Sequence, residues 1–261
     1  MTDVLEIAKK DGRWTECPAC KETIITVKLR ENLHVCPHCD FHLRIGARER
    51  LAVTCDAQGL IELDPKTLAL EDPAGSEDAI MGALGSILGE PCVVGAMNFG
   101  FKGGSMGMAM GQAIITLMQH ARQASWPLVF FCASGGVRVQ EGIWGLMQML
   151  KTVHARNNAD IPLITVYTDP TYGGVTASFS ALADIILAEP GARIGFAGPR
   201  VIKETSHIEL PPDFQNALSL QTHGFLDMVV HRHAMRATLG YILKWIASDL
   251  NPRAPLPQEN P

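Results

Sequence analysis

The stretch that decides the fold is Leu128-Val129-Phe130-Phe131-Cys132-Ala133-Ser134-Gly135-Gly136-Val137-Arg138. It joins an apolar run of strand composition to a glycine pair and then to a segment with helical periodicity. Two further glycine pairs, Gly103-Gly104 and Gly173-Gly174, stand between an apolar run and the segment that follows it. Glycine lets the backbone come close to a ligand at such a turn, and the next helix presents unpaired N–H groups. The three junctions therefore predict an α/β domain that can bind an anion or a developing oxyanion.

Short apolar runs alternate with helical segments through the rest of the chain, which favours an α/β layered domain. Strands are expected at Cys92–Phe101, Leu128–Ala133, Ile161–Thr168 and Ile185–Glu189, and helices at Met106–Ala124, Arg138–Arg156 and Met235–Leu250. Within the large domain no strand is predicted before Cys92, and the acidic segment from Asp64 to Asp78 is expected to be a surface loop or linker. We predict a small module with a lead-out helix at residues 1–50, a large domain at 51–250 and a disordered, proline-rich tail at 251–261.

Four of the 7 cysteines form two C-x-x-C pairs, Cys17 with Cys20 and Cys36 with Cys39, with fifteen residues between the pairs. This spacing is typical of a four-thiolate zinc site, and it predicts a zinc ribbon in which Thr23–Leu29 forms a strand of the hairpin. Because all four ligands would be cysteines, no position is left for water, so the zinc is expected to be structural. Cys55, Cys92 and Cys132 lie in apolar contexts and are expected to be core thiols.

Composition excludes several classes of protein. With 47% hydrophobic and 19% charged residues, the 261-residue chain can bury a sizeable core. The net charge of −5 argues against a nucleic-acid-binding protein, although a zinc ribbon that binds RNA or DNA remains a rival interpretation of residues 1–50. The sequence contains no signal-peptide pattern and no apolar run long enough to span a membrane. We expect a soluble, cytoplasmic protein with no membrane partner.

The segment Gly103-Gly104-Ser105-Met106-Gly107 matches the G-x-S-x-G pattern of serine hydrolases, and Asp227 and His231 follow it in the order of a triad. However, no predicted strand precedes this segment to build the sheet of such an enzyme, and no oxyanion segment of the HGGG type occurs before it. We therefore interpret Ser105 as a turn residue. The sequence also lacks a P-loop and a G-x-G-x-x-G motif, so nothing supports nucleotide binding.

Several of these segments together resemble the β subunit of the bacterial acetyl-CoA carboxylase carboxyltransferase. The resemblance covers nearly the whole chain. It lies in Cys17–Cys39, Gly103–Gly107, Ala133–Glu141, Thr168–Ser178, Ile194–Ile202, Leu210–Gln215 and Gly224–Val229. It implies a crotonase-like superhelix of ββα units behind the ribbon. It also implies a transfer of the carboxyl group from carboxybiotin, held by a biotin carboxyl carrier protein, to acetyl-CoA, giving malonyl-CoA for fatty acid biosynthesis.

The resemblance also implies roles for the residues at the junctions. Backbone N–H groups of Gly136 and Gly174 would hold the enolate oxygen, so the catalytic residues are expected to be Gly135, Gly136, Gly173 and Gly174. Substrate-binding residues are expected to be Gly103, Gly104, Ser134 and Arg138. A structural ion pair between Arg138 and Glu141 is the alternative to a substrate contact. The second oxyanion site would come from a carboxyltransferase α subunit in an α2β2 heterotetramer, so this chain alone should be inactive.

The chain departs from the family pattern at two places. The segment between the ribbon and the first glycine pair, Asp64–Ser86, is short and acidic, and Val137, Val139 and Tyr172 stand where the family more often has Ala, Met and Thr. These differences leave the acyl group, its carrier (CoA or a carrier protein) and the pathway open. They also keep a second reaction on the same fold possible, the biotin-independent decarboxylation of a malonyl thioester.

Overall fold

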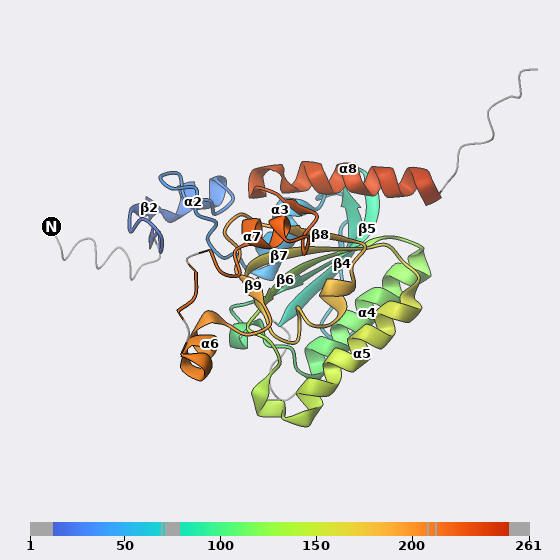
Figure 1. Cartoon of the computed structure of the whole chain (residues 1–261). Helices are drawn as coiled ribbons and strands as arrows, with labels where there is room; N and C mark the ends of the chain where they lie inside the picture. Colours follow the sequence, from blue (N-terminus) through green and yellow to red (C-terminus); the bar gives the residue numbers. More distant parts are fainter. Residues whose placement is uncertain (1–12, 69, 71–78, 208, 212, 251–261) are drawn as a thin grey trace, which may run out of the picture.

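The computed structural model describes residues 13–68, 70, 79–207, 209–211 and 213–250, which form a central sheet with helices on both faces and a small N-terminal module at one end (Figure 1). The tail predicted at 251–261 lies outside the described residues, as do residues 71–78 of the expected acidic loop. None of the helices in the described part of the chain combines the length and apolar character needed to cross a membrane.

The sheet has the strand order β10-β8-β7-β6-β5-β4-β3, and β9 pairs with β7. The strands are β3 (Ile61–Glu62), β4 (Ile80–Ile87), β5 (Glu90–Met97), β6 (Leu128–Ser134), β7 (Leu163–Tyr172), β8 (Ile185–Ala188), β9 (Ile194–Gly195) and β10 (Met228–Val229). Pairing is parallel from β5 through β6, β7 and β8 to β10, and antiparallel at β3–β4 and β4–β5. The parallel strands therefore end at one edge of the sheet, where all three glycine pairs follow.

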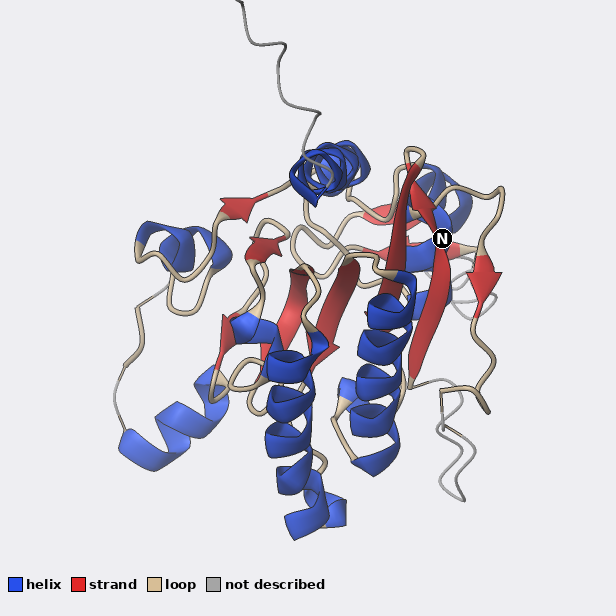
Figure 2. Ribbon diagram, turned by 90° about the vertical axis from the view of Figure 1, so that its right-hand side faces the viewer, coloured by secondary structure: helices blue, strands red, loops and turns tan. Residues whose placement is uncertain are grey.

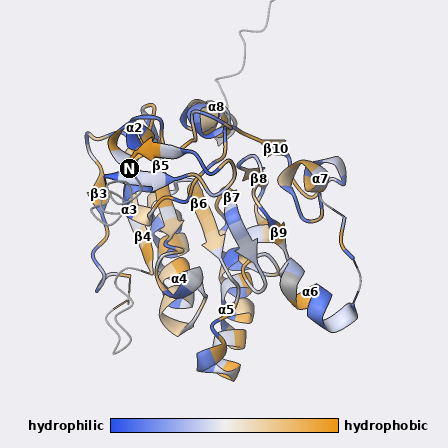
Figure 3. Cartoon of the chain, turned by 90° about the vertical axis from the view of Figure 1, so that its left-hand side faces the viewer, coloured by the Kyte–Doolittle hydropathy of each residue, from blue (hydrophilic) through white to orange (hydrophobic). Residues whose placement is uncertain are grey.

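Helices cover both faces of the sheet (Figure 2). On one face lie α4 (Met108–Ala124) and α5 (Ile143–Ala159), and on the other α3 (Ala47–Thr54) and α8 (Arg232–Leu250). Along β6, which is largely orange in Figure 3, Phe130 packs in the cluster that contains α4, whereas Phe131 packs in the cluster that contains α3 and α8. This alternation is the two-residue period of a strand buried on both faces. The remaining helices are α2 (Thr26–Glu31), α6 (Pro199–Ser206) and α7 (Ala217–Thr222).

Two local predictions are wrong. Within the ribbon, β1 (Trp14–Glu16) pairs with β2 (Thr23–Ile25), but the expected strand stops there and α2 begins at Thr26. A continued strand would bury Val27 and Leu29 on one face, whereas the structure exposes Val27 and buries Leu29 in the ribbon core. The strand β4 was also not predicted, because its two glycines interrupt the apolar pattern. One of them is needed for packing, since a Cβ on Gly82 would lie 2.4 Å from Leu117 of α4.

The other predicted strands and helices are present, with shifted ends. In particular, α5 begins at Ile143, five residues after the predicted start at Arg138, so no α-helix follows the second glycine pair directly. The strands β5 to β8 and the helices α4, α5 and α8 lie where the apolar runs and the helical periodicity predict them. Cys55, Cys92 and Cys132 are buried in the core, as expected, and burial raises the pKa of Cys55 to about 11. The helix α3 runs across the predicted domain boundary at residue 50, and its apolar residues pack against the sheet.

Candidate active site and zinc centre

The three glycine pairs meet at the edge of the sheet where β5, β6 and β7 end. The amide of Gly135 donates to the carbonyl of Gly103 (2.8 Å), which joins the first junction to the second. A Cβ on Gly104 would lie 2.0 Å from the carbonyl oxygen of Ala133, so this contact requires glycine. The second junction touches the third, because a Cβ on Gly173 would lie 2.9 Å from the Cα of Gly136. Segments about seventy residues apart in the sequence thus form one compact backbone cluster.

Ser134 braces this cluster from inside. Its side chain is fully buried, and its Oγ donates to the carbonyl of Gly104 (2.7 Å) while accepting the amide of Gly136 (3.0 Å). The resemblance implies a free N–H donor at Gly136, but in this structure that amide is already engaged. Ser134 therefore contributes as a brace between the first and second junctions.

Several other amides at the cluster, among them those of Val137, Gly174 and Val175, have no acceptor within the described residues. Two hydrogen bonds join Met106 to the residues on either side of Val137. Met106 N donates to Gly136 O (2.8 Å), and Arg138 N donates to Met106 O (2.9 Å), so the N–H of Val137 itself takes part in neither. Among the hydrogen bonds of the described residues, none is donated by the amide of Val137 or of Gly174. The two residues are in contact, since a Cβ on Gly174 would lie 2.3 Å from Cγ2 of Val137. Gly174 is buried and Val137 is half-buried. Backbone N–H groups removed from water are normally paired, so these two amides, which lie in contacting residues, are candidates to donate to a ligand.

Arg138 and Glu141 are held inside the protein. The Arg138 side chain is 5% exposed; its Nη1 lies 3.1 Å from Glu141 Oε1, and its Nε and Nη2 donate to Oγ and the carbonyl of Ser105. Glu141 also accepts the amide of Met108 (2.6 Å) at the start of α4. The pair thus ties the loop after the first junction to the segment after the second. In this structure all three guanidinium nitrogens of Arg138 are used internally, as the ion-pair alternative requires.

Ser105 does not belong to a triad in the part of the chain that the structure describes. Its Oγ donates to the carbonyl of Lys102 (2.8 Å). Asp227 accepts the amide of Ile186, and His231 lies 3.2 Å from Asp40, so neither contacts Ser105. The match to the hydrolase pattern is therefore a turn that serves the glycine cluster.

A pocket of about 550 Å³ adjoins the third junction. It is lined by Thr176, Gly195, Gln215 and Phe225 among others, and most of its surface is apolar. The Oγ1 of Thr176 donates to the carbonyls of Gly173 and Gly195 (both 2.8 Å), which joins the pocket wall to the junction. No pattern in the sequence predicts Gln215 or Phe225 as pocket residues, because they lie about forty and fifty residues after the junction.

An exposed apolar surface follows the second junction on α5 and the turn before it. We call it the α5 surface, and it consists of Val139, Ile143, Trp144, Leu146, Met147 and Leu150. Their exposed fractions range from 39% to 83%. A contiguous apolar surface of this kind marks an interaction site in soluble proteins.

The ribbon brings the four predicted zinc ligands together. The Sγ atoms of Cys17, Cys20, Cys36 and Cys39 all lie within 4.8 Å of one another. The Sγ of Cys17 is 3.6 Å from that of Cys39, and the Sγ of Cys20 is 3.7 Å from that of Cys36. Zinc–thiolate bonds of about 2.3 Å in a tetrahedron place the sulfurs about 3.8 Å apart, so the cluster has the dimensions of a zinc site.

Comparison with known proteins agrees with this geometry. Residues 44–248 match the carboxyl transferase domain family, and residues 14–39 match the acetyl-CoA carboxylase zinc finger domain. The chain is 44% identical over 253 residues to the acetyl-CoA carboxylase carboxyl transferase subunit beta of Carboxydothermus hydrogenoformans, covering 90% of each chain. It is 43% identical to the beta/alpha chain of Saccharopolyspora erythraea, covering 89% of this chain and 44% of that one.

The fold agrees as well. The solved structure of transcarboxylase 12S superposes on this chain with a TM-score of 0.68 and 26% sequence identity. The match covers 77% of this chain and 42% of the transcarboxylase chain. The predicted crotonase-like α/β fold with an N-terminal zinc ribbon is confirmed. The chain belongs to the family of acetyl-CoA carboxylase carboxyl transferase β subunits.

Proposed function

We propose that this chain binds acetyl-CoA and directs its carboxylation to malonyl-CoA, with the thioester oxygen held by the amides of Val137 and Gly174. The observation that carries the proposal is that these two N–H groups lie in contacting residues and have no acceptor within the described residues. Removing a proton from the α-carbon of a thioester places negative charge on the carbonyl oxygen. Each well-placed donor stabilises that charge by about 3 kcal/mol in the transition state.

The glycine cluster explains why these amides are available. Ser134 and the carbonyl of Gly103 take up the amides of Gly136 and Gly135, which fixes the backbone of the second junction. The fixed backbone leaves Val137 N–H without an acceptor among the residues that the structure describes. Donors that are oriented before the reaction begins need no reorganisation as charge develops. Gly135, Gly136 and Gly173 therefore contribute to catalysis by positioning the donors, and Gly103, Gly104, Ser134 and Arg138 by bracing them.

Within the described part of the chain, no side-chain base is hydrogen-bonded to either amide. Glu141, the nearest carboxylate in the sequence, is already bonded to Arg138 and to the amide of Met108. This arrangement fits a reaction in which the base comes from outside the chain. Biotin, held by a carrier protein, would supply the carboxyl group and, once it has lost that group, the base.

We also propose that the pocket beside Thr176 and Gln215 holds part of the acyl-CoA and that the α5 surface binds a carboxyltransferase α subunit. The α5 surface begins at Val139, two residues after the proposed donor Val137, so a partner seated there would close the site. In the Saccharopolyspora relative the beta and alpha parts form one chain, which supports this partner. The zinc would be structural, since four cysteines leave no open ligand position.

The test is reconstitution of the chain with an α subunit, a biotin carrier and acetyl-CoA. Malonyl-CoA should form with the complete set and not with this chain alone. Trp144→Asp, on the α5 surface, should abolish both co-purification and activity. Trp245→Asp is the matched control, because Trp245 is similarly exposed (55% against 62%) but lies on α8. Decarboxylation of malonyl-CoA without biotin would instead favour the alternative reaction.

A further inference from the structure

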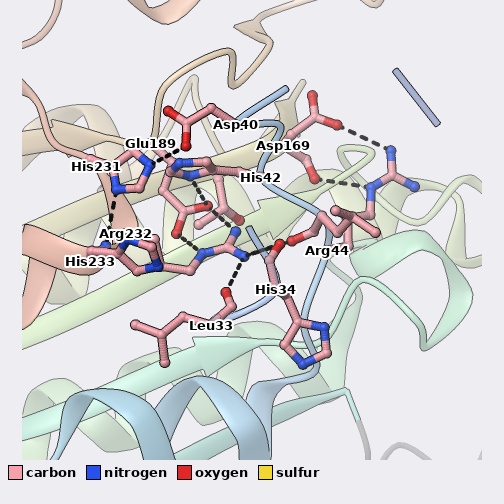
Figure 4. A network of polar contacts seen from close by, with 12 residues as sticks. Leu33, His34, Asp40, His42, Arg44, Asp169, Glu189, His231, Arg232 and His233 are labelled. Atoms are coloured by element: carbon pink, nitrogen blue, oxygen red, sulfur yellow. Dashed lines mark hydrogen bonds and ion pairs between the residues drawn. The ribbon is translucent and has the colours of Figure 1, made fainter. Parts of the chain in front are cut away.

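A single buried guanidinium joins the zinc ribbon to the sheet domain. Arg232, the first residue of α8, has a side chain that is 2% exposed. Its Nε and Nη2 donate to the two carboxylate oxygens of Glu189, and its Nη1 donates to the carbonyls of Leu33 (3.0 Å), His34 (3.3 Å) and Leu43 (2.8 Å) (Figure 4). One side chain therefore contacts both the core of the sheet domain and the backbone of the ribbon and its exit segment.

The site holds more positive than negative charge, and the carbonyls of the ribbon and its exit segment offset part of the excess. Glu189 is 2% exposed and is shared by Arg232 and by Arg50 of α3, whose Nη1 lies 2.6 Å away. Burial alone would raise the pKa of Glu189, but the two guanidinium groups hold it well below its ordinary value. Two cations therefore share one buried carboxylate. The three carbonyl oxygens offer their negative ends to the excess positive charge, and without them a guanidinium nitrogen would stay buried and unpaired.

The three carbonyls face Arg232 only because the ribbon is folded. Leu33 and His34 both have left-handed backbone conformations, with φ of 52° and 57°, which residues other than glycine rarely adopt. They are held by hydrogen bonds from His34 N to Leu29 O and from Leu43 N to His34 O. The predicted zinc ligand Cys36 lies two residues after His34, and its amide donates to the carbonyl of Phe41. Ribbons of this size have too little core to fold without metal, so this carbonyl arrangement depends on zinc.

The exit segment also reaches the end of β7. Arg44, next to Leu43, donates from Nε to the carbonyl of Asp169 (3.1 Å), and its guanidinium lies over the ring of Phe99. Asp169 also binds the side chain of Arg193 (2.8 Å). Four residues further along the same strand and its turn stands Gly173, the glycine that contacts Gly136.

We propose that Arg232 and Glu189 form a socket that binds the folded, zinc-loaded ribbon, and that the docked ribbon positions the third glycine junction through Arg44 and Asp169. The second half of this proposal rests on the proposed function, whereas the first half does not. Because docking favours the folded ribbon and the folded ribbon favours zinc, the two equilibria are linked, and each must strengthen the other by the same factor.

Zinc release from the full chain tests the socket. Arg232→Lys keeps the positive charge, but one ammonium group cannot reproduce the five hydrogen bonds of the guanidinium. We expect the Arg232→Lys variant to release zinc to a chromogenic chelator about tenfold faster than the wild type does, since hydrogen bonds to a charged group are lost. Arg48→Lys is the matched control, because Arg48, on α3, makes an exposed ion pair with Glu62. This variant should release zinc at the wild-type rate. Wild-type release from a folded Arg232→Lys variant would overturn the socket.

Hydrogen exchange on the wild-type full chain decides the matter if Arg232→Lys does not fold. After chelation, the socket predicts faster exchange in the ribbon and also at residues 172–175 and at the start of α8. Faster exchange confined to residues 14–43 would overturn it.

Activity of the reconstituted complex tests the coupling. Arg44→Met leaves the socket intact, so zinc release should match the wild type while kcat falls about tenfold with little change in KM, because a shifted junction misplaces a donor. Arg44→Lys should restore part of kcat. A wild-type kcat for Arg44→Met would overturn the coupling. If the wild-type complex itself transfers no carboxyl group, the proposed function fails, and the zinc-release result still decides the socket.

Discussion

The second and third glycine junctions share one sequence pattern but differ in the hydrogen bonds of their glycine amides. Each follows a parallel strand of the sheet, and each has two glycines and then a valine, Gly135-Gly136-Val137 and Gly173-Gly174-Val175. In the second junction both glycine amides are used inside the protein, by Gly103 O and by Ser134 Oγ. In the third, the amide of Gly173 donates to Gly195 O (3.0 Å), and the amide of Gly174 has no acceptor among the described residues.

This difference separates two roles that a glycine pair can have. Gly136 and Gly173 are needed because their backbones touch, and both have a positive φ. Gly174 has no positive φ, and a Cβ there would lie 2.3 Å from Cγ2 of Val137. In the proposed function its amide must also stay accessible. The pattern therefore marks where two backbones meet, whereas the proposed donors are inferred from hydrogen bonds and contacts that the pattern does not contain.

The largest effect should come from Gly173→Val, which breaks the contact between the two junctions. The new side chain would lie 2.9 Å from the Cα of Gly136 and would adopt a φ of 65°, which a β-branched residue strongly disfavours. Both donors would be displaced, so we expect kcat to fall about 10³-fold or more and the melting temperature to drop. Gly59→Val is the control, because Gly59 has a φ of 76° but open space around it, so only the melting temperature should change.

Gly174→Ala should separate the donors without backbone strain. A Cβ at this position would lie 2.3 Å from Cγ2 of Val137, so the two residues must move apart. Because the donors act mainly on the developing enolate, kcat should fall about 10²-fold while KM changes little. In the double variant Val137→Ala with Gly174→Ala the clash is removed, and kcat should recover in part. An unchanged kcat in the single variant would exclude the amide of Gly174 as a donor.

Ser134→Ala should have a smaller effect, because it removes the brace and leaves both donors in place. The buried amide of Gly136 and carbonyl of Gly104 would each lose a partner, which costs about 1–3 kcal/mol of unfolding free energy. We expect a lower melting temperature and a kcat lower by about tenfold, since a shifted backbone misplaces Val137. Thr165→Val provides the comparison. Thr165 is equally buried and donates to Ser180 O away from the junctions, so its loss should reduce stability and leave kcat unchanged. Equal losses of kcat in the two variants would show that Ser134 has no specific role.

Much of this molecule follows from short-range patterns in the sequence. The apolar runs of β5 to β8 and the periodicity of α4, α5 and α8 predict those elements, since their residues are buried in the way the patterns require. The spacing of Cys17, Cys20, Cys36 and Cys39 alone predicts the sulfur cluster, because each pair spans one turn. The strand β4 is not predicted because Gly82 interrupts its apolar pattern. Glycine is needed there for packing against Leu117, which lies on a later helix.

The candidate site shows the same limit. Glycine pairs predict the three junctions, but the donor assignment depends on partners from other segments. Gly103, about thirty residues earlier, accepts the amide of Gly135, and Met106 bonds on both sides of Val137. The socket at Arg232 is likewise made of residues separated by up to two hundred positions. A single sequence carries no local signal for such contacts.

The smallest effect should come from Ser105→Ala, which tests whether the glycine cluster needs any nucleophile. Ser105 Oγ donates to the carbonyl of Lys102 and accepts from Arg138, and the second contact lies at the edge of the cluster. Losing the bond to the buried Arg138 side chain should cost about 1–3 kcal/mol of unfolding free energy, so a modest drop in melting temperature is expected. Because the main-chain carbonyl of Ser105 still accepts from Arg138, the loop should keep its position. We expect kcat within about twofold of the wild type, and no hydrolysis of acetyl-CoA by either protein. An inactive Ser105→Ala beside an active Gly174→Ala would reverse the assignment, because catalysis would then depend on the hydroxyl and not on the two backbone amides.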